Sequence, residues 1–229
     1  MGLKDNIKKN AKRMAYSNAL LYKLWNGIKS AKKILLPSGN YTLENKGCAR
    51  IRRDIEGEGH IIQISEGCLL EDTSIYIRGK NNKIVFEENC MVGEECSFWM
   101  EGENITIVIG ANTTFTYGVH MCAQENDASI VVGKDCMFSN NIILRTSDSH
   151  PMYDLHTGKR INSPANVSIG DHVWIAPNTK IMKGAVVGDG TIIGSDTMVS
   201  KSIPANVLAV GHPAKVVKTD VTWSRESLF

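Results

Sequence analysis

The sequence lacks any long hydrophobic run. Its longest apolar stretches fall well short of the roughly 18 residues that a membrane-spanning helix requires. The apolar stretch near the N-terminus is interrupted by Lys23 and therefore lacks a clean signal-peptide core. Met1 and Gly2 do not begin a convincing myristoylation signal, because Asn6 stands where Ser or Thr is expected. These absences favour a soluble, cytoplasmic protein.

The composition of a disordered chain is also missing. The protein has 229 residues, of which 42% are hydrophobic and 22% charged. Such a chain is long enough to bury one sizeable core, so we expect one main domain.

A six-residue repeat runs from Ile169 to Ile203. A small or β-branched residue recurs at every sixth position from Val173 to Ile203. Neither a helix nor a hairpin has this period, whereas one strand and one turn per hexapeptide, stacked coil on coil, form a parallel β-helix. The aliphatic positions that would build one interior column per wall are Ile169, Ile175, Ile181, Val187, Ile193 and Val199.

A slower repeat precedes it. Segments beginning at Ile64, Phe86, Ile109 and Val132 are 22, 23 and 23 residues apart. Three hexapeptides make an 18-residue coil, so the extra residues must gather at one corner, in the similar stretches RGKNNKIVF, EGENITIVI and QENDASIVV. Asn and Gly in these stretches suit a tight polar turn.

The six cysteines allow three disulfides or a set of free thiols. Four of them take the fifth place of a hexapeptide, where a small apolar side chain points into the coil, and this favours reduced core thiols over disulfides. These four are Cys68, Cys90, Cys96 and Cys136.

Charge is distributed unevenly. Residues 1–33 hold nine Lys or Arg and one acid, for +8, and the rest of the chain carries −6. Apolar residues spaced at threes and fours from Lys4 to about Ile34 predict a basic amphipathic helix. This helix either caps the open first coil or lies on an anionic membrane surface or polyanion, and both roles are compatible. We expect no nucleic-acid partner.

The hexapeptide rhythm stops after Ser149 and resumes at Ile169. The intervening HPMYDLHTGKRINSPANVS is too polar for a coil and predicts a loop excursion over 150–168, where function tends to lie. The predicted organisation is a helical segment (1–36), a β-helix domain (37–218) and a C-terminal tail (219–229).

Four stretches resemble the hexapeptide-repeat O-acetyltransferases, above all those that acetylate capsular and other cell-surface polysaccharides. They are DSHPMYDLHTGKRIN, SIGDHVWIAPNTKI, VVGDGTIIGSDTMVSKSIPAN and AVGHPAKVVK. The resemblance covers about residues 60–220 and implies an all-β fold, a left-handed parallel β-helix. It also implies a homotrimer, acetyl-coenzyme A bound between neighbouring β-helices, and a glycan acceptor. The interval from His150 to Trp174 is similar to that between the catalytic histidine and functional tryptophan of the polysialic-acid type.

Acetyl transfer from a thioester to a sugar hydroxyl needs a base, because an alcohol is a weak nucleophile at neutral pH. His150, at the start of the loop, is the predicted base for direct transfer, with His156 as second choice. Asp148 either orients the imidazole or faces solvent. Trp174 follows the inward-facing Val173 and is expected to point into the groove between subunits, or simply to pack the trimer.

By family position, Ser195, Ser200 and Lys201 are expected along the path of coenzyme A, with Lys215 near its phosphates and Trp174 over the thioester arm. Gly194-Ser195-Asp196 departs from the family's usual Gly-Ala-Gly, and Val119 or His120 stands where galactoside acetyltransferases have an asparagine. Candidate acceptor contacts are Tyr153, His156, Arg160 and Asn162. Arg160 can pair with an acidic sugar or can anchor the loop to the acidic body.

Three alternatives share this fold. A xenobiotic acetyltransferase of the chloramphenicol or streptogramin type uses similar residues. A γ-type carbonic anhydrase would need a metal, with His120, His150 and His156 as ligands, although we predict no metal site. A non-catalytic scaffold could use the basic helix at the inner face of a membrane.

Overall fold

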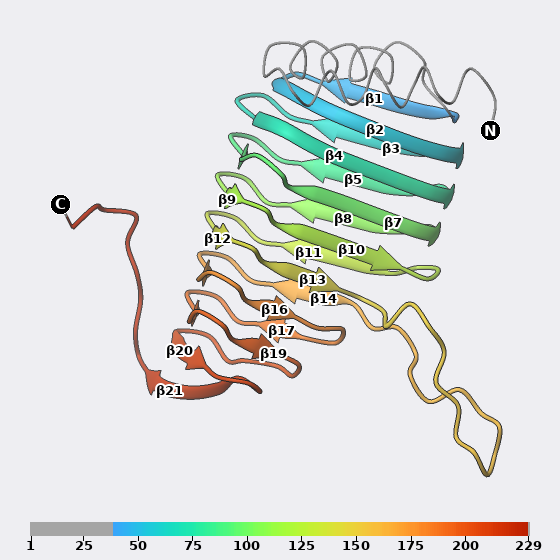
Figure 1. Ribbon diagram of the computed structural model, residues 1–229. Coiled ribbons are helices and arrows are strands. Elements are labelled where there is room, and N and C mark those ends of the chain that lie inside the picture. Colours follow the sequence, from blue (N-terminus) through green and yellow to red (C-terminus); the bar gives the residue numbers. More distant parts are fainter. Residues whose placement is uncertain (1–38, 229) are drawn as a thin grey trace, which may run out of the picture. The chain divides into compact units, whose positions relative to one another are not determined.

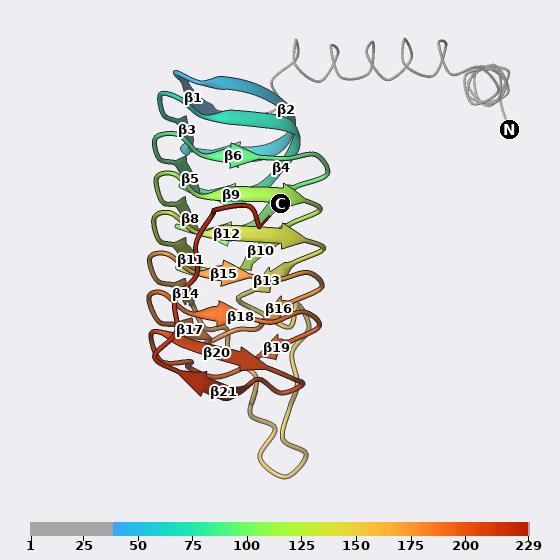
Figure 2. The same cartoon turned by 90° about the vertical axis from the view of Figure 1, so that its left-hand side faces the viewer.

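A computed structural model describes residues 39–228, and every structural statement below concerns this part of the chain. The predicted helical segment, 1–36, lies outside the described residues. From Gly39 onward the chain winds as a parallel β-helix, and its short strands stack into three walls (Figures 1 and 2). The all-β, left-handed hexapeptide fold predicted from the sequence is confirmed.

Wall 1 is a seven-stranded parallel sheet. Its strands are β1 (Tyr41–Asn45), β3 (His60–Ile64), β5 (Lys83–Phe86), β8 (Thr106–Ile109), β11 (Ser129–Val132), β14 (Val167–Ile169) and β17 (Val186–Val187).

Walls 2 and 3 are hydrogen-bonded to each other, because two strands of the first coils are long enough to turn a corner. These strands are β2 (Cys48–Glu58) and β4 (Leu69–Lys80). The first residues of β4 pair with β6 in wall 2, and its later residues pair with β7 in wall 3. The other strands of wall 2 are β6 (Met91–Val92), β9 (Thr114–Tyr117), β12 (Met137–Asn140), β15 (Trp174–Ile175), β18 (Ile192–Ile193) and β20 (Val207–Val210). Wall 3 continues with β7 (Ser97–Glu103), β10 (His120–Gln124), β13 (Ile143–Arg145), β16 (Lys180–Ile181) and β19 (Met198–Val199).

The strand register bears out both sequence repeats. In wall 1, Ile64 pairs with Phe86, Phe86 with Ile109, and Ile109 with Val132. Val132 then pairs with Ile169 across the long loop. The aliphatic positions picked out by the repeat therefore form continuous interior columns, one on each wall.

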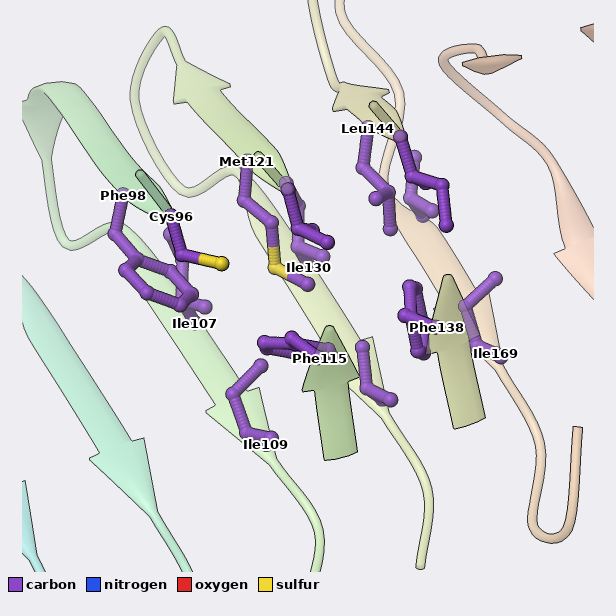
Figure 3. Close-up of a cluster of buried hydrophobic side chains, with 14 of the residues drawn as sticks. Cys96, Phe98, Ile107, Ile109, Phe115, Met121, Ile130, Phe138, Leu144 and Ile169 are labelled. Atoms are coloured by element: carbon purple, nitrogen blue, oxygen red, sulfur yellow. The ribbon is translucent and has the colours of Figure 1, made fainter. Parts of the chain in front are cut away.

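The core is a column of aliphatic side chains into which phenylalanines are inserted from all three walls. Figure 3 shows Phe98, Phe115 and Phe138 among their aliphatic neighbours. Phe86 and Phe98 meet edge to face with ring centroids 5.1 Å apart, and Phe115 and Phe138 do so at 4.7 Å. A large side chain that is fully buried in this way contributes about 1.5–3 kcal/mol through the hydrophobic effect.

All six cysteines are free thiols, which the hexapeptide positions predicted for Cys68, Cys90, Cys96 and Cys136. Three of them donate from a corner to a carbonyl of the following coil, Cys68 to Glu87 at 2.9 Å being the shortest of these hydrogen bonds. Burial raises the pKa of Cys90 and of Cys136 to about 12, so both stay protonated at neutral pH.

The extra residues of the early coils lie at the corner between wall 3 and wall 1. Gly79 and Gly102 have positive φ there, and a side chain on Gly79 would collide with the backbone of Gly102. The buried Asn82 fills this corner: its Nδ2 donates to Gly102 O at 2.9 Å and its Oδ1 accepts from the next coil. This corner, which we call the 3–1 corner, holds the residues by which the early coils exceed 18. The corner between walls 2 and 3 lengthens by one residue at each of the first two steps.

The last coil ends in an antiparallel hairpin in which β21 (Lys215–Thr219) pairs with β20. The tail then turns back along the outside of the β-helix, past β15 and β12 (Figure 2).

We predict that Phe138→Ala lowers the free energy of unfolding by about 3–5 kcal/mol, because it empties a fully buried site between two coils. Met137→Ala, at the outward-facing neighbour, is the control and should cost far less. Urea denaturation at one fixed protein concentration measures both, and equal losses would contradict the inward assignment of Phe138.

Candidate active site

One loop interrupts the stack of coils. The chain leaves wall 3 after Arg145 and rejoins wall 1 at Val167, and the segment between them projects from the body (Figure 1). The projecting arm is a hairpin in which Tyr153 and Arg160 form an antiparallel bridge. The long excursion predicted from the broken rhythm is therefore present, and it replaces a turn of the 3–1 corner.

The tip of this hairpin is internally ordered but exposed. The carboxylate of Asp154 accepts hydrogen bonds from the backbone N–H of His156 at 3.0 Å and of Thr157 at 2.7 Å. Tyr153 is 58% exposed and Leu155 97%. Two of the predicted acceptor contacts, Tyr153 and His156, thus stand on an exposed arm.

The base of the loop is clamped between two coils by ion pairs. Arg160 makes a two-pronged pair with Glu125 of the preceding coil, at 2.5 and 2.8 Å. Asp148 pairs with Lys183 of the following coil at 2.5 Å. The bonds from Arg160, helped by one from Ser147, hold the pKa of Glu125 at about 2 despite its burial. Of the two roles considered for Arg160, the structure gives it the loop anchor.

Asn162 is buried at the base of the loop and joins its two ends. It was predicted as an acceptor contact, but it is only 4% exposed, and its amide is used up within the loop. Its Nδ2 donates to Asp148 Oδ2 and to the backbone oxygen of His150, both at 2.9 Å. Its Oδ1 accepts from Met152 N at 2.7 Å. Asn162 therefore fixes the backbone at His150.

His150 combines a fixed backbone with an exposed ring. Its imidazole makes no hydrogen bond within residues 39–228, so it is open to a reactant. Asp148 does not bond to this ring, because Lys183 and Asn162 occupy its carboxylate and hold the pKa of Asp148 below its usual value. The orienting role considered for Asp148 is therefore indirect, through Asn162 and the His150 backbone.

Trp174 lies on wall 2, on β15. Its neighbour Ile175 points inward and is fully buried, so the indole points outward, as predicted. In a three-sided coil, the 3–1 corner and wall 2 are opposite each other. His150 and Trp174 of one chain are thus separated by the core.

The C-terminal tail packs beside Trp174. Trp223 is 8% exposed and stacks on His172 with ring centroids 4.3 Å apart. Its Nε1 donates to His172 O at 2.8 Å, and its ring centroid lies 6.2 Å from that of Trp174. Arg225 fastens the tail further by donating to Asp135 at 2.8 Å. Burial raises the pKa of Asp135, but the hydrogen bonds from Arg225 and His172 outweigh burial and lower this pKa below its ordinary value.

Three of the predicted cofactor residues converge at the end of the β-helix. Ser200, Lys201 and Lys215 line one cavity of about 370 Å³, together with Pro213. Ser195 lies at an exposed turn between β18 and β19, and neither it nor Trp174 lines this cavity.

The histidines of the metal alternative do not gather. Residues 39–228 contain no group of three His, Cys, Asp or Glu side chains placed to hold a metal ion. His120 instead contacts Ser97 Oγ through Nδ1 at 2.7 Å on wall 3.

No helix within residues 39–228 is long and apolar enough to span a bilayer.

Sequence reasoning missed the partners of the predicted residues. Glu125 and Lys183 looked like ordinary polar corner residues, and only the stacking of coils shows that they flank the loop. Trp223 carried a signal that could have been used, since an indole in a short polar tail needs a surface to cover it.

Stacked hexapeptide coils, a corner loop that presents an exposed histidine and an outward-facing tryptophan define the class of hexapeptide-repeat acyltransferases. Residues 166–201 match the family described as "Bacterial transferase hexapeptide (six repeats)". The chain is 32% identical to the polysialic acid O-acetyltransferase of Neisseria meningitidis in an alignment of 193 positions, which covers 75% of this chain and 88% of that protein. The chain therefore belongs to the hexapeptide-repeat O-acetyltransferase family.

Other relatives agree. The polysialic acid O-acetyltransferase of Escherichia coli O1:K1 is 34% identical over 119 residues, but these span only 38% of that protein's length. The crystal structure of the polySia-specific acetyltransferase NeuO superposes with a TM-score of 0.71 and 26% identity, covering 83% of this chain and 84% of that chain. The polysialic acid O-acetyltransferase OatWY superposes with a TM-score of 0.59 and 25% identity, over 83% and 90% of the two chains.

The Glu125–Arg160 pair predicts how the loop responds to acid. The pKa of Glu125 is about 2 in the folded protein against 4.5 ordinarily, so the pair stabilises the loop fully above pH 4.5 and is lost as the pH falls through 2. Hydrogen-exchange protection of the loop, corrected for intrinsic rates, should fall across this window. Glu125→Gln should lower protection at neutral pH and remove the acid dependence, whereas the exposed control Glu66→Gln should change neither. An unchanged acid dependence in Glu125→Gln would contradict the assignment.

The tail contacts predict a local effect of Trp223→Ala. Without the stack on His172 and the Nε1 hydrogen bond, residues 221–226 should exchange their amide hydrogens much faster, while the interior strands keep their protection. Thr222→Ala, at an exposed neighbour, is the control. Tail exchange as slow as in the wild type would show that Trp223 does not hold the tail.

Proposed function

We propose that the protein transfers the acetyl group of acetyl-coenzyme A to a hydroxyl of a cell-surface or capsular glycan or its precursor. The observation that carries this proposal is the exposed imidazole of His150 on a clamped loop base, in a chain of this family. Relatives named for polysialic acid, and the N. meningitidis protein in particular, support a glycan acceptor.

His150 acts as the general base. Its imidazole takes the proton from the acceptor hydroxyl as the oxygen attacks the thioester carbonyl, and the carbon–sulfur bond breaks. The proton then passes to the departing thiolate of coenzyme A, so the acetyl group moves directly and no acyl-enzyme forms. The clamp of Asn162, Asp148 and Lys183 serves this step by fixing the backbone of His150.

The working site is formed by two copies of the chain. His150 lies at the 3–1 corner and Trp174 on the opposite wall, so the two side chains meet only when the corner of one copy faces wall 2 of another. A closed ring of three copies provides this contact three times, which supports a homotrimer. The indole of Trp174 then covers the thioester arm or packs on the sugar.

The phosphates of coenzyme A bind at the basic cavity at the end of the β-helix. Lys201 and Lys215 supply positive charge for its phosphates, and Ser200 supplies a hydroxyl. The thioester supplies an activated acetyl group when coenzyme A is bound.

Mixing two inactive variants tests the role of His150 as general base and the formation of the site by two copies of the chain. His150→Ala and Trp174→Ala should each lower thiol release from acetyl-coenzyme A, in the presence of the acceptor, by about 100-fold or more. Unfolding the two together and refolding them at equal amounts should restore about a quarter of wild-type activity, since each interface draws its two contributors at random.

Two controls accompany this experiment. The double variant His150→Ala/Trp174→Ala, refolded with itself, should recover nothing. Tyr41→Phe, which keeps a partly buried ring far from the loop along the chain, should retain wild-type activity before and after refolding. No gain on mixing would contradict the two-copy site, and near-full activity of His150→Ala would contradict the base.

A further inference from the structure

Arg145 is an arginine without an acidic partner. Four other arginines of residues 39–228 pair with carboxylates: Arg52 with Asp72, Arg78 with Asp54 and Glu56, Arg160 with Glu125, and Arg225 with Asp135. Arg145 is half-buried, and no carboxylate of the described chain lies within ion-pair distance of it. A partly desolvated cation that lacks a counter-charge is costly, so an anion supplied from outside would bind favourably.

The surroundings of Arg145 hold it in place without neutralising it. Its Nη2 donates to Ser149 Oγ at 2.6 Å, and that hydroxyl donates to Gln124 Oε1 at 2.6 Å. Gln124 Nε2 donates in turn to Glu101 at 2.7 Å. The nearest carboxylate in this chain of hydrogen bonds is therefore separated from the guanidinium by two side chains. Asp148, whose pKa the charge of Arg145 also helps to lower, is already paired with Lys183.

The guanidinium retains unused donors. Nε is buried and makes no hydrogen bond. The guanidinium bonds to Ser149 Oγ and to the thiol of Cys122, its register partner one coil earlier, and both are neutral groups. A guanidinium in this state is suited to a two-pronged contact with a carboxylate, for which its planar fork is the matching shape.

Arg145 is also next to the reacting group. It is the last residue of β13, and the serine that it holds, Ser149, directly precedes His150. On the same outer face, one coil earlier, stands His120, whose pKa is lowered by burial and by the charge of Arg145. This face therefore presents a half-buried guanidinium without an acidic partner, beside neutral hydrogen-bonding side chains and, one coil later, the exposed Lys180.

We propose that Arg145 is a specificity residue that binds the carboxylate of an acidic sugar and so brings a hydroxyl of that sugar to His150. The proposal rests on the glycan acetyltransferase function proposed above and names the chemical class of its acceptor. A phosphate of coenzyme A is the other anion that could bind Arg145, and the experiment below distinguishes it from the sugar carboxylate.

The test compares a short polysialic acid oligomer with the same oligomer after its carboxylates are reduced to alcohols. For the wild type, kcat/KM should be about tenfold or more higher with the acidic oligomer. Arg145→Gln should raise KM for the acidic oligomer by a similar factor and leave it little changed for the reduced one. The preference should then collapse to within about twofold, and Arg145→Lys should restore part of it.

The control is Arg52→Gln, which removes one positive charge from the same wall far from the loop along the chain. It should leave both KM values within about twofold of the wild type, which separates a specific contact from general attraction of a polyanion. Two results would overturn the proposal. One is a raised KM for acetyl-coenzyme A alone, which would assign Arg145 to a phosphate. The other is an equal loss with both oligomers, which would make its role structural.

Direct binding separates this proposal from the proposed function. Calorimetric titration of the two oligomers needs no turnover. If the wild type transfers no acetyl group but binds the acidic oligomer in an Arg145-dependent way, the carboxylate site stands and the transferase proposal fails. If the acidic oligomer binds equally well to wild type and Arg145→Gln, the carboxylate site is wrong whatever the activity.

Discussion

Parallel strand register is the constraint on which the rest of this structure depends. Each coil must place its inward side chains directly on those of the coil before it, because backbone hydrogen bonds join the walls residue by residue. A slip of one residue would turn a column of core side chains to solvent. Walls therefore cannot change length, and every insertion must be made at a corner.

The 3–1 corner takes most of this variation, and the corner between walls 2 and 3 takes single residues in the first coils. The 3–1 corner holds the wide turns of the early coils and then the long loop, and the chain still returns to register, with Val132 paired to Ile169. Adjacent coils place their polar corner residues above and below the loop, so Glu125 and Lys183 can clamp it from both sides. A regular scaffold thus gives a long loop a fixed base, which an isolated loop lacks and which the role proposed for His150 requires.

The sequence predicted the parts of this structure that depend on periodicity. The interior columns, the free corner thiols, the place of the loop and the outward direction of Trp174 all follow from the count of six. It could not predict contacts between coils at positions outside the repeat. Arg160 meets Glu125 across 35 residues, and the buried position of Asn162 depends on Asp148 and on the carbonyl of His150. The fold-back of Trp223 onto His172 spans 51 residues and follows no repeat at all.

The three-sided cross-section also limits where chemistry can take place. A small triangular coil is filled by its own side chains, so it has no interior room for a substrate, and any reaction must occur on the outside. One outer wall is too flat to surround an acceptor and a thioester. Facing surfaces of two copies can surround them, and each surface can then be specialised. Wall 3 and its corner carry His150 and the unpaired Arg145, while wall 2 carries Trp174, braced by the tail at Trp223. In the proposed function, assembly joins an acceptor surface to a donor surface that one chain holds on opposite sides.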